Sequence, residues 1–411
     1  MKRHLIGIGG VGMSALATAL VRLGDEVTGA DRTRGTPNVR FLESLGVRVF
    51  PDDGSGVDAA TDEVIVSTAI EPTNAGLVRG KALGIPVTHR AKALARTLEG
   101  RRLVAVVGTC GKSTVTAMLG HVLAACGFDP FCVNGANVPG WEGAVRFGRG
   151  EYAVAEVDES DRSLVAFRPY AAIVTNASAD HYSKEEMDAV FDAFVKDLPG
   201  PLVDGRARAD FATEVATSMP GRHNRQNAAL ALRMALALGC DETQAREALL
   251  SFGGVERRLQ RVFPRGGNGR STPVYDDYAH NPEKLKAMWT TLAEAYPDGV
   301  CVVWRPHGYA PLRKMMDALA AMFAEMIRPQ DRLLLLPVYD AGGTTDRSVS
   351  SDELAAKIVS GVTCVADLDA AFDWCLAHRN AFGAFATCGA RDPGLPALAA
   401  RLSEALASAD A

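Results

Sequence analysis

The most constraining feature of this sequence is the segment 104–114, in which a β-branched apolar run leads into a glycine turn, a lysine and two hydroxyl residues. A helical pattern follows, so strand, turn and helix stand in the order of a phosphate-binding loop. Gly108 and Gly111 let the backbone curl around phosphate oxygens. Lys112 is placed for the β- and γ-phosphates and Ser113 for Mg²⁺. The segment predicts a nucleotide site; the alternative is an ordinary turn between a strand and a helix.

The composition limits the classes of protein to which the chain can belong. Of 411 residues, 47% are hydrophobic and 23% are charged, as in a globular protein with several domains. The net charge of −5 argues against a nucleic-acid surface. We find no signal peptide and no apolar run of about 18 residues, so we expect no membrane insertion. The eight scattered cysteines favour a reducing cytoplasm over a disulfide framework or a zinc site.

The first 99 residues have the layout of a Rossmann-type unit. The pattern predicts a strand at 4–8, the turn Gly7-x-Gly9-x-x-Gly12, a helix at 13–23 and a strand at 26–29. Shorter elements follow, with strands at 64–67 and 85–88 and a helix at 74–83. The glycine turn allows a diphosphate to approach the helix N-terminus, and Asp31, after the second strand, suits a ribose hydroxyl.

The rest of the chain alternates strands and helices, which predicts mostly parallel sheets covered on both faces. The predicted strands are 152–157, 171–175, 273–278, 300–304, 332–336 and 385–387. The predicted helices are 113–126, 226–238, 242–252, 312–326, 351–359, 368–378 and 395–407, with another that Asn281 caps and Pro282 begins. We expect three domains, at 1–99, 100–255 and 256–411.

Polar residues at the ends of the predicted strands are the candidates for chemistry, because ligands bind there in such sheets. Glu156 ends an apolar strand, where a carboxylate needs a metal or an arginine to neutralise it. His181 is either a ligand of Mg²⁺ or Mn²⁺ or an ordinary loop or helix-cap histidine. The asparagines of 223–227 either cap the next helix or bind an adenine edge. Arg258 is either a surface arginine or a guanidinium that neutralises a transferring phosphoryl group.

In this order, these segments resemble the Mur ligase family, and the resemblance covers nearly the whole chain. The segments that carry it are 7–14, 67–70, 89–91, 108–114, 156–161, 175–181, 223–227, 257–258 and 276–282. The resemblance implies an α/β fold of three domains: an N-terminal Rossmann-like domain that binds a UDP-sugar, a central ATPase-type domain with a phosphate loop, and a C-terminal Rossmann-like ligase domain. It implies a cytoplasmic ligase of peptidoglycan synthesis, in which ATP activates the carboxylate of UDP-N-acetylmuramate as an acyl phosphate and an amino acid or peptide amine attacks it.

The resemblance also implies roles for individual residues. ATP would be bound by Gly108, Thr109, Gly111, Lys112, Ser113, Thr114, His223, Asn224, Asn227 and Asp277. The UDP-sugar substrate would be bound by Gly9, Gly10, Gly12, Asp31, Ser67, Thr68, Arg90, Ser160 and His280. Mg²⁺ would be held by Ser113, Glu156 and His181, and catalysis would depend on Lys112, Glu156, His181 and Arg258. The assembly implied is a monomer or a homodimer, with no nucleic-acid or membrane partner.

The chain departs from the family pattern at several positions. Only 41 residues separate His181 from His223, which predicts a trimmed central domain. Cys110 stands where the family's loop usually has a histidine. Pro306-His307 is not followed by the arginines expected to grip an amino acid carboxylate, although Arg313 remains, so the identity of the amine is open.

Two further differences lie in the last domain: Asn281 replaces a histidine, and 389–391 only loosely matches the family's glycine motif. These departures from the family pattern leave other functions open. The chain could join a different amino acid or peptide, or bind nucleotides without turnover. A nicotinamide-dependent oxidoreductase is suggested only by the first glycine turn, and it leaves the second phosphate loop unexplained.

Overall fold

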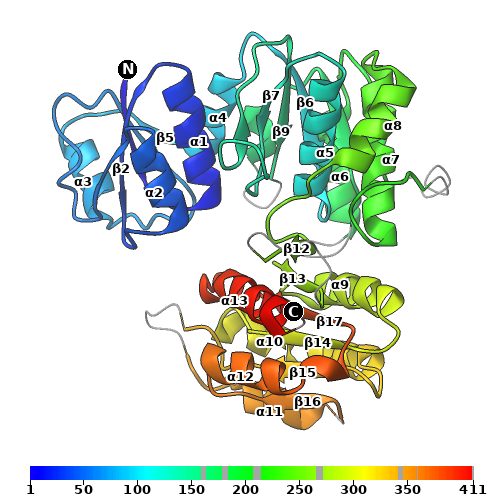
Figure 1. The fold of residues 1–411 in the computed structure, drawn as a ribbon. Helices are drawn as coiled ribbons and strands as arrows, with labels where there is room; N and C mark the ends of the chain where they lie inside the picture. Colours follow the sequence, from blue (N-terminus) through cyan, green and yellow to red (C-terminus); the bar gives the residue numbers. More distant parts are fainter. Residues whose placement is uncertain are drawn as a thin grey trace. The chain divides into compact units, whose positions relative to one another are not determined.

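The computed structural model describes residues 1–158, 163–177, 184–206, 214–264, 272–340, 346–358 and 360–409. Residues 1–219 and 224–255 form one compact unit, and residues 220–223 and 256–411 form a second. The chain is α/β, as predicted, with two sheets in the first unit and one in the second (Figure 1).

The first sheet is parallel throughout and has the strand order β3-β2-β1-β4-β5. Its strands are β1 (Lys2–Ile6), β2 (Glu26–Asp31), β3 (Arg48–Pro51), β4 (Glu63–Val66) and β5 (Val87–His89). Its helices are α1 (Val11–Arg22), α2 (Pro37–Ser44), α3 (Ala75–Ala82) and α4 (Arg90–Thr97). The strand predicted at 4–8 ends earlier because Gly7 turns the chain with φ +74°. The strand order reverses between β1 and β4, which is where sheets of this kind bind ligands.

The second sheet has the order β11-β10-β6-β9-β7-β8, and all its neighbours are parallel except β7 and β8. Its strands are β6 (Arg102–Val107), β7 (Phe131–Val133), β8 (Val145–Arg146), β9 (Tyr152–Glu156), β10 (Ala171–Val174) and β11 (Leu202–Asp204). Its helices are α5 (Lys112–Ala125), the 3₁₀ turn η1 (Ser163–Ala166), α6 (Lys184–Val195), α7 (Arg222–Ala237) and α8 (Glu242–Ser251). The phosphate-loop strand β6 therefore lies between β9, which ends at Glu156, and β10, which Thr175 and Asn176 follow.

The third sheet has the order β12-β13-β17-β14-β15-β16, with β12 antiparallel at one edge. Its strands are β12 (Gln260–Val262), β13 (Val274–Asp277), β14 (Val300–Trp304), β15 (Arg332–Leu335), β16 (Val362–Cys364) and β17 (Ala384–Cys388). Its helices are α9 (Pro282–Ala295), α10 (Tyr309–Met326), α11 (Ser351–Lys357), α12 (Leu368–Ala377), the 3₁₀ turn η3 (Arg379–Ala381) and α13 (Gly394–Ala409). The Asn281 side chain accepts from the Lys284 amide, which confirms the predicted cap of α9.

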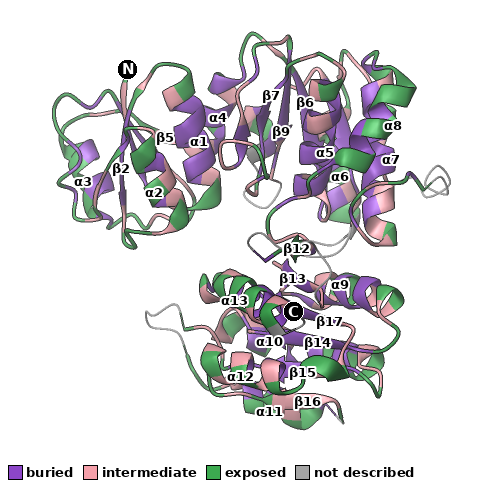
Figure 2. Cartoon of the chain, in the orientation of Figure 1, coloured by how far each residue is buried: buried purple, intermediate pink, exposed green. Residues whose placement is uncertain are grey.

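Burial follows the sheets, whose central strands are lined with buried residues (Figure 2). In the first unit one apolar cluster includes Leu16 of α1, Leu94 of α4 and Phe131 of β7, so the first and second sheets share a core. In the second unit the rings of Trp289 and Trp304 pack against other buried side chains of the core. All eight cysteines are free thiols. No helix in the described part of the chain has the length and apolar composition needed to cross a bilayer.

Candidate functional site

The predicted phosphate loop connects β6 to α5, and two of its glycines have positive φ, +129° at Gly108 and +84° at Gly111. A Cβ atom at Gly108 would lie 2.1 Å from Oγ1 of Thr175, and one at Gly111 would lie 2.6 Å from Oδ1 of Asn227. Both positions thus require glycine, for backbone conformation and for space. The close approach also shows that segments following β10 and within α7 lie directly against the loop.

Thr175 and Asn176, which follow β10, fasten the loop at Cys110. The Asn176 Oδ1 atom accepts from the Thr109 hydroxyl at 2.6 Å and from the Cys110 amide at 2.9 Å. Its Nδ2 atom donates to the Cys110 carbonyl at 2.9 Å, and the Thr175 hydroxyl donates to the same carbonyl at 2.6 Å. The pair belongs to the segment 175–181 that carries the family resemblance, but no individual role was predicted for either residue. The available signal was their position directly after a strand that neighbours the loop's own strand.

Lys112 and Ser113 begin α5. The Lys112 ammonium donates to the Gly108 carbonyl at 2.6 Å and lies 3.9 Å from a carboxylate oxygen of Asp158. The Ser113 side chain is buried at the base of the loop. The helix N-cap is Gly111, which has no side chain to compete with an anion for the first amides. A positive charge, a hydroxyl and a helix N-terminus therefore stand at one turn.

Glu156 ends β9, and its Oε2 atom accepts from the Gly135 amide at 2.8 Å. In register it pairs with Val106 of β6, so its carboxylate stands one strand away from the phosphate loop. This hydrogen bond stabilises the Glu156 carboxylate. Among the described residues, no arginine forms an ion pair with Glu156.

The donor set fits Mg²⁺ rather than a metal held entirely by protein. The Ser113 hydroxyl and the Glu156 carboxylate are hard oxygen ligands, and Mg²⁺ commonly takes one or two such groups with phosphate and water. Within the described ranges no group of three His, Cys, Asp or Glu residues has the geometry of a metal site. The predicted ligand His181 and the predicted substrate residue Ser160 lie outside the described residues.

The polar segment at 223–227 lies within α7 and not in front of it, because α7 begins at Arg222. Asn224 and Asn227 are therefore not N-caps, which corrects one reading of the sequence. Both are buried, and the Asn227 side-chain amide donates to Asn224 Oδ1 at 3.4 Å. The start of α7 was not recognised from the sequence, because buried polar residues interrupt the apolar periodicity of this helix. In the second unit, Nδ1 of His223 lies 3.4 Å from the Thr291 hydroxyl.

At the first glycine turn, Asp31 holds the backbone in place. Its carboxylate accepts from the Gly9 amide at 2.8 Å and from the Thr33 amide at 2.9 Å. Asn38, which is not among the predicted site residues, donates to the Gly9 carbonyl at 2.9 Å. Asp31 thus stabilises the backbone of the turn directly, in addition to the ribose contact that the sequence predicts for it.

Arg90 reaches the same turn from the start of α4. A Cβ atom at Gly12 would lie 2.9 Å from Nη1 of Arg90, so the guanidinium covers the first turn of α1. The N-cap of α1 is Gly10, which leaves this helix end without a capping side chain. Ser67 and exposed Thr68 follow the neighbouring strand β4. The structure therefore brings a cation, a helix N-terminus and hydroxyls to the reversal point of the first sheet.

In the second unit, Arg257 and Arg258 lie beside two acidic residues at the end of β13. Asp276 is 1% exposed and accepts from Arg257 Nε at 3.0 Å. Burial raises the pKa of Asp276 to about 6, and the Arg257 charge opposes that rise. Asp277 accepts from the amides of Leu259 at 2.6 Å and Ala279 at 2.7 Å. Desolvation raises the pKa of Asp277, and the charge of Arg258 opposes that rise. The carboxylates therefore fix the turn that carries the arginines.

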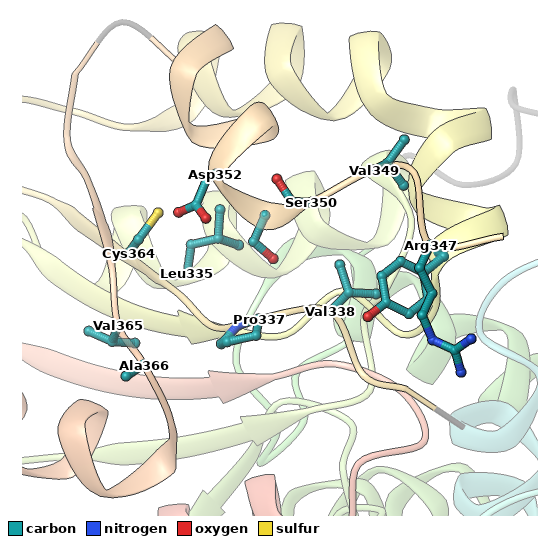
Figure 3. A pocket seen from close by; sticks show the side chains of 12 residues that line it. Leu335, Pro337, Val338, Arg347, Val349, Ser350, Asp352, Cys364, Val365 and Ala366 are labelled. Atoms are coloured by element: carbon teal, nitrogen blue, oxygen red, sulfur yellow. The ribbon is translucent and has the colours of Figure 1, made fainter. Parts of the chain in front are cut away.

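A separate cavity of about 400 Å³ lies beyond β15 and β16 (Figure 3). Its apolar side includes Leu335 and Val365, and its rim carries Arg347, which is paired with Asp340 at 2.7 Å. Burial and Asp352 raise the pKa of the Cys364 thiol there to about 11. None of the residues predicted to act in binding or catalysis lines this cavity.

Comparison with known proteins gives the same family as the sequence motifs. Residues 2–102 match the model of the Mur ligase family, catalytic domain, and residues 257–408 match that of the Mur ligase, glutamate ligase domain. A UDP-N-acetylmuramate–L-alanine ligase from Rubrobacter xylanophilus is 36% identical, over 89% of this chain and 89% of that protein. The enzyme of the same name from an Arthrobacter species is 35% identical, over 89% and 87%.

Solved structures show the same fold. The crystal structure of the UDP-N-acetylmuramate–alanine ligase from Thermotoga maritima matches with a TM-score of 0.81 and 24% identity, covering 100% of both chains. A murein peptide ligase from Psychrobacter arcticus matches with a TM-score of 0.66 and 20% identity, covering 99% of both. Together with the sequence relatives, these findings establish that the chain belongs to the Mur ligase family, whose members form amide bonds with ATP in peptidoglycan synthesis.

Proposed function

We propose that this chain joins the carboxylate of UDP-N-acetylmuramate to an amine through an acyl phosphate, with ATP converted to ADP and phosphate. The observation that carries the proposal is the phosphate loop itself, with Lys112 and Ser113 at the start of α5 and Glu156 on the adjacent strand β9. The sequence relatives named UDP-N-acetylmuramate–L-alanine ligase support this choice of substrate.

The proposal gives each part of the chain a separate task. Residues 1–99 bind the UDP-sugar at the reversal point of the first sheet, where Arg90 covers the start of α1. Residues 100–255 bind ATP and Mg²⁺ at the phosphate loop. Residues 256–411 supply Arg258 and the site for the amine. Such a reaction has to bring two groups together: the carboxylate of the UDP-sugar, bound beyond the strand ends of the first sheet, and the γ-phosphate of ATP, bound at the N-terminus of α5.

The chemistry follows from the weakness of a carboxylate as an electrophile. A carboxylate oxygen of the sugar nucleotide attacks the γ-phosphorus, and ADP leaves. The neutral amine then attacks the acyl carbon; inorganic phosphate leaves with the former carboxylate oxygen, and the nitrogen loses a proton. Lys112 and Arg258 neutralise negative charge on the phosphates, which lowers the repulsion between the two anions. Ser113, Glu156 and His181 would hold Mg²⁺, which would supply further neutralisation of the phosphate charge.

The amine is tested by direct assay. ATP, Mg²⁺ and UDP-N-acetylmuramate are supplied with each amino acid in turn, beginning with L-alanine and including short peptides. Phosphate release is measured, and the product is identified by mass spectrometry. We expect release only when both an amine and the sugar carboxylate are present, and none with UDP-N-acetylglucosamine. ATP binding with no release for any amine would identify a nucleotide-binding homologue without turnover.

A further inference from the structure

The two adjacent arginines that begin the second unit's sheet differ in their tasks, and the partners of Arg257 show why. Arg257 donates through Nε to Asp276 at 3.0 Å and through Nη2 to the Gly389 carbonyl at 2.5 Å. Its guanidinium is therefore bound by β13 and by the loop that follows β17. An arginine held by two such partners serves to hold its segment in place, which leaves the chemistry of the phosphates to Arg258.

Asp276, the charged partner of Arg257, is itself fixed by the sheet. It is 1% exposed, and its Oδ1 atom accepts from the Thr387 hydroxyl at 2.7 Å while its Oδ2 atom accepts from Arg257. Asp276 and Thr387 are direct neighbours in the register of β13 and β17. Each carboxylate oxygen thus has a donor, which a buried charge requires. The position of the Arg257 side chain therefore depends on two central strands.

The backbone on both sides of Arg258 is also fastened to the end of β13. The Arg257 carbonyl accepts from the Tyr278 amide at 2.8 Å, and the Leu259 amide donates to the Asp277 carboxylate at 2.6 Å. These two flanking residues have positive φ, +57° and +47°. Because Arg258 lies between two fixed positions, its backbone can shift only if one of these contacts breaks.

The ring of Tyr278 contacts both guanidinium groups. The Cζ atom of Arg257 lies 5.1 Å from the ring centroid, and that of Arg258 lies 5.7 Å from it. Such distances allow a favourable interaction between each cation and the ring. The ring also lies edge-on to His280, with centroids 5.5 Å apart. Since the two arginines share one ring, the placement of Arg257 limits where the Arg258 guanidinium can lie.

We propose that Asp276 is a positioning residue for the ligase reaction, which directs the Arg258 guanidinium by holding Arg257. This inference rests on the proposed function, in which Arg258 neutralises charge on the phosphates. A group that stabilises a transition state loses about 100-fold in rate when it is misplaced by about 1 Å. Asp276 should therefore affect kcat far more than the binding of ATP.

The first experiment needs neither substrate nor turnover. The full chain is labelled with ¹⁵N at its arginine side chains, and NMR follows the Nε–H signal of Arg258. Asp276→Asn should move this signal towards that of a solvent-exposed arginine. Asp331→Asn should leave it unchanged, because Asp331 is also 1% exposed and pairs with Arg328 at 2.8 Å, but precedes β15 at the amino ends of the strands. An unmoved Arg258 signal in Asp276→Asn would overturn the proposal.

The second experiment compares phosphate release in single and double variants. Asp276→Asn should lower kcat about 10- to 100-fold, with KM for ATP nearly unchanged. Added to Arg258→Gln, it should cause little further loss, because it acts through Arg258; a purely structural role would give additive losses. Arg257→Gln, which breaks the same link from the other side, should reproduce the effect if Asp276→Asn folds poorly. Arg257→Lys, which keeps the charge beside Asp276, should recover part of the rate.

The turnover assay separates two kinds of failure. If Arg258→Gln is impaired while Asp276→Asn keeps the wild-type kcat, or if their losses are additive, the positioning role is wrong. If Arg258→Gln itself keeps the wild-type kcat, the error lies in the proposed function, which assigns Arg258 to the phosphates. The NMR comparison of Asp276→Asn with Asp331→Asn then still decides whether Asp276 orients Arg258.

Discussion

Asn176 forms hydrogen bonds with both backbone polar groups of Cys110: its Nδ2 atom donates to the Cys110 carbonyl and its Oδ1 atom accepts from the Cys110 amide, each at 2.9 Å. One side chain that follows β10 therefore supplies hydrogen bonds to the loop, in place of the strand-to-strand bonds that the chain no longer makes after β6 ends. Such a contact orders the loop before any nucleotide arrives, so less conformational entropy is lost on binding.

Asn176→Ala should weaken ATP binding, because the loop loses these bonds and the one from Thr109. At about 1–3 kcal/mol for groups left unsatisfied, affinity should fall about 10- to 100-fold. Calorimetric titration with an ATP analogue measures the loss. UDP-N-acetylmuramate binding serves as the control and should be unchanged. Unaltered ATP affinity in the variant would mean that the hydrogen bonds between Asn176 and the loop are irrelevant to nucleotide binding.

Gly108→Ala tests whether close approach or backbone conformation dominates at the loop. Its Cβ would lie 2.1 Å from the Thr175 hydroxyl, whereas Gly127 also has a positive φ, +83° against +129° at Gly108, and nothing within 4 Å. Gly127→Ala should cost about 1 kcal/mol of stability and leave ATP affinity intact. Gly108→Ala should cost more and also impair ATP binding. Denaturant unfolding and nucleotide titration are the measurements; equal behaviour of the two variants would refute the packing argument.

Lys112→Ala should lower the rate of ATP-dependent phosphate release by about 100- to 1000-fold, because a charge is removed from the developing transition state. Binding of UDP-N-acetylmuramate should remain nearly intact, since Arg90 and the first glycine turn are untouched. Lys357→Ala, at a surface lysine paired with Asp317, is the matched control. Loss of both activities in Lys112→Ala would show that the two binding tasks are not divided as proposed.

Buried His4 should make the first unit sensitive to acid. Burial lowers the pKa of His4 to about 4, so the unfolded chain takes up its proton first as the pH falls. The stability that depends on neutral His4 is complete above about pH 6.5 and is lost as the pH falls towards 4, by about 2 kcal/mol at pH 5.

Urea unfolding at pH 7 and pH 5 measures this loss. His4→Gln should be less stable at pH 7 but should lose less on acidification, because it carries no titrating ring. Exposed His378→Gln should keep the wild-type difference. A His4→Gln variant with the full wild-type loss between the two pH values would assign the acid sensitivity to another group.

The long elements could be read from the sequence because their patterns are local. The strand at 300–304 coincides with β14, and the segment 104–114 forms the expected strand, turn and helix. A glycine turn between an apolar strand and a helix can be recognised without knowing its distant partners, because the steric requirement for glycine is local. The two-residue strand β8 (Val145–Arg146) and β12 were missed, since strands this short exist only through their pairing.

The sequence by itself determined the α/β class, the family and the phosphate loop, all of which rest on spacing within a few dozen residues. Only the tertiary structure placed Asn176 on Cys110, put Asn224 inside α7, and joined Thr387 to Asp276. These contacts join positions far apart in the chain, and strand register decides them. Register depends on how whole sheets pack, and a side chain near the end of a strand carries no local sign of which neighbour it will meet.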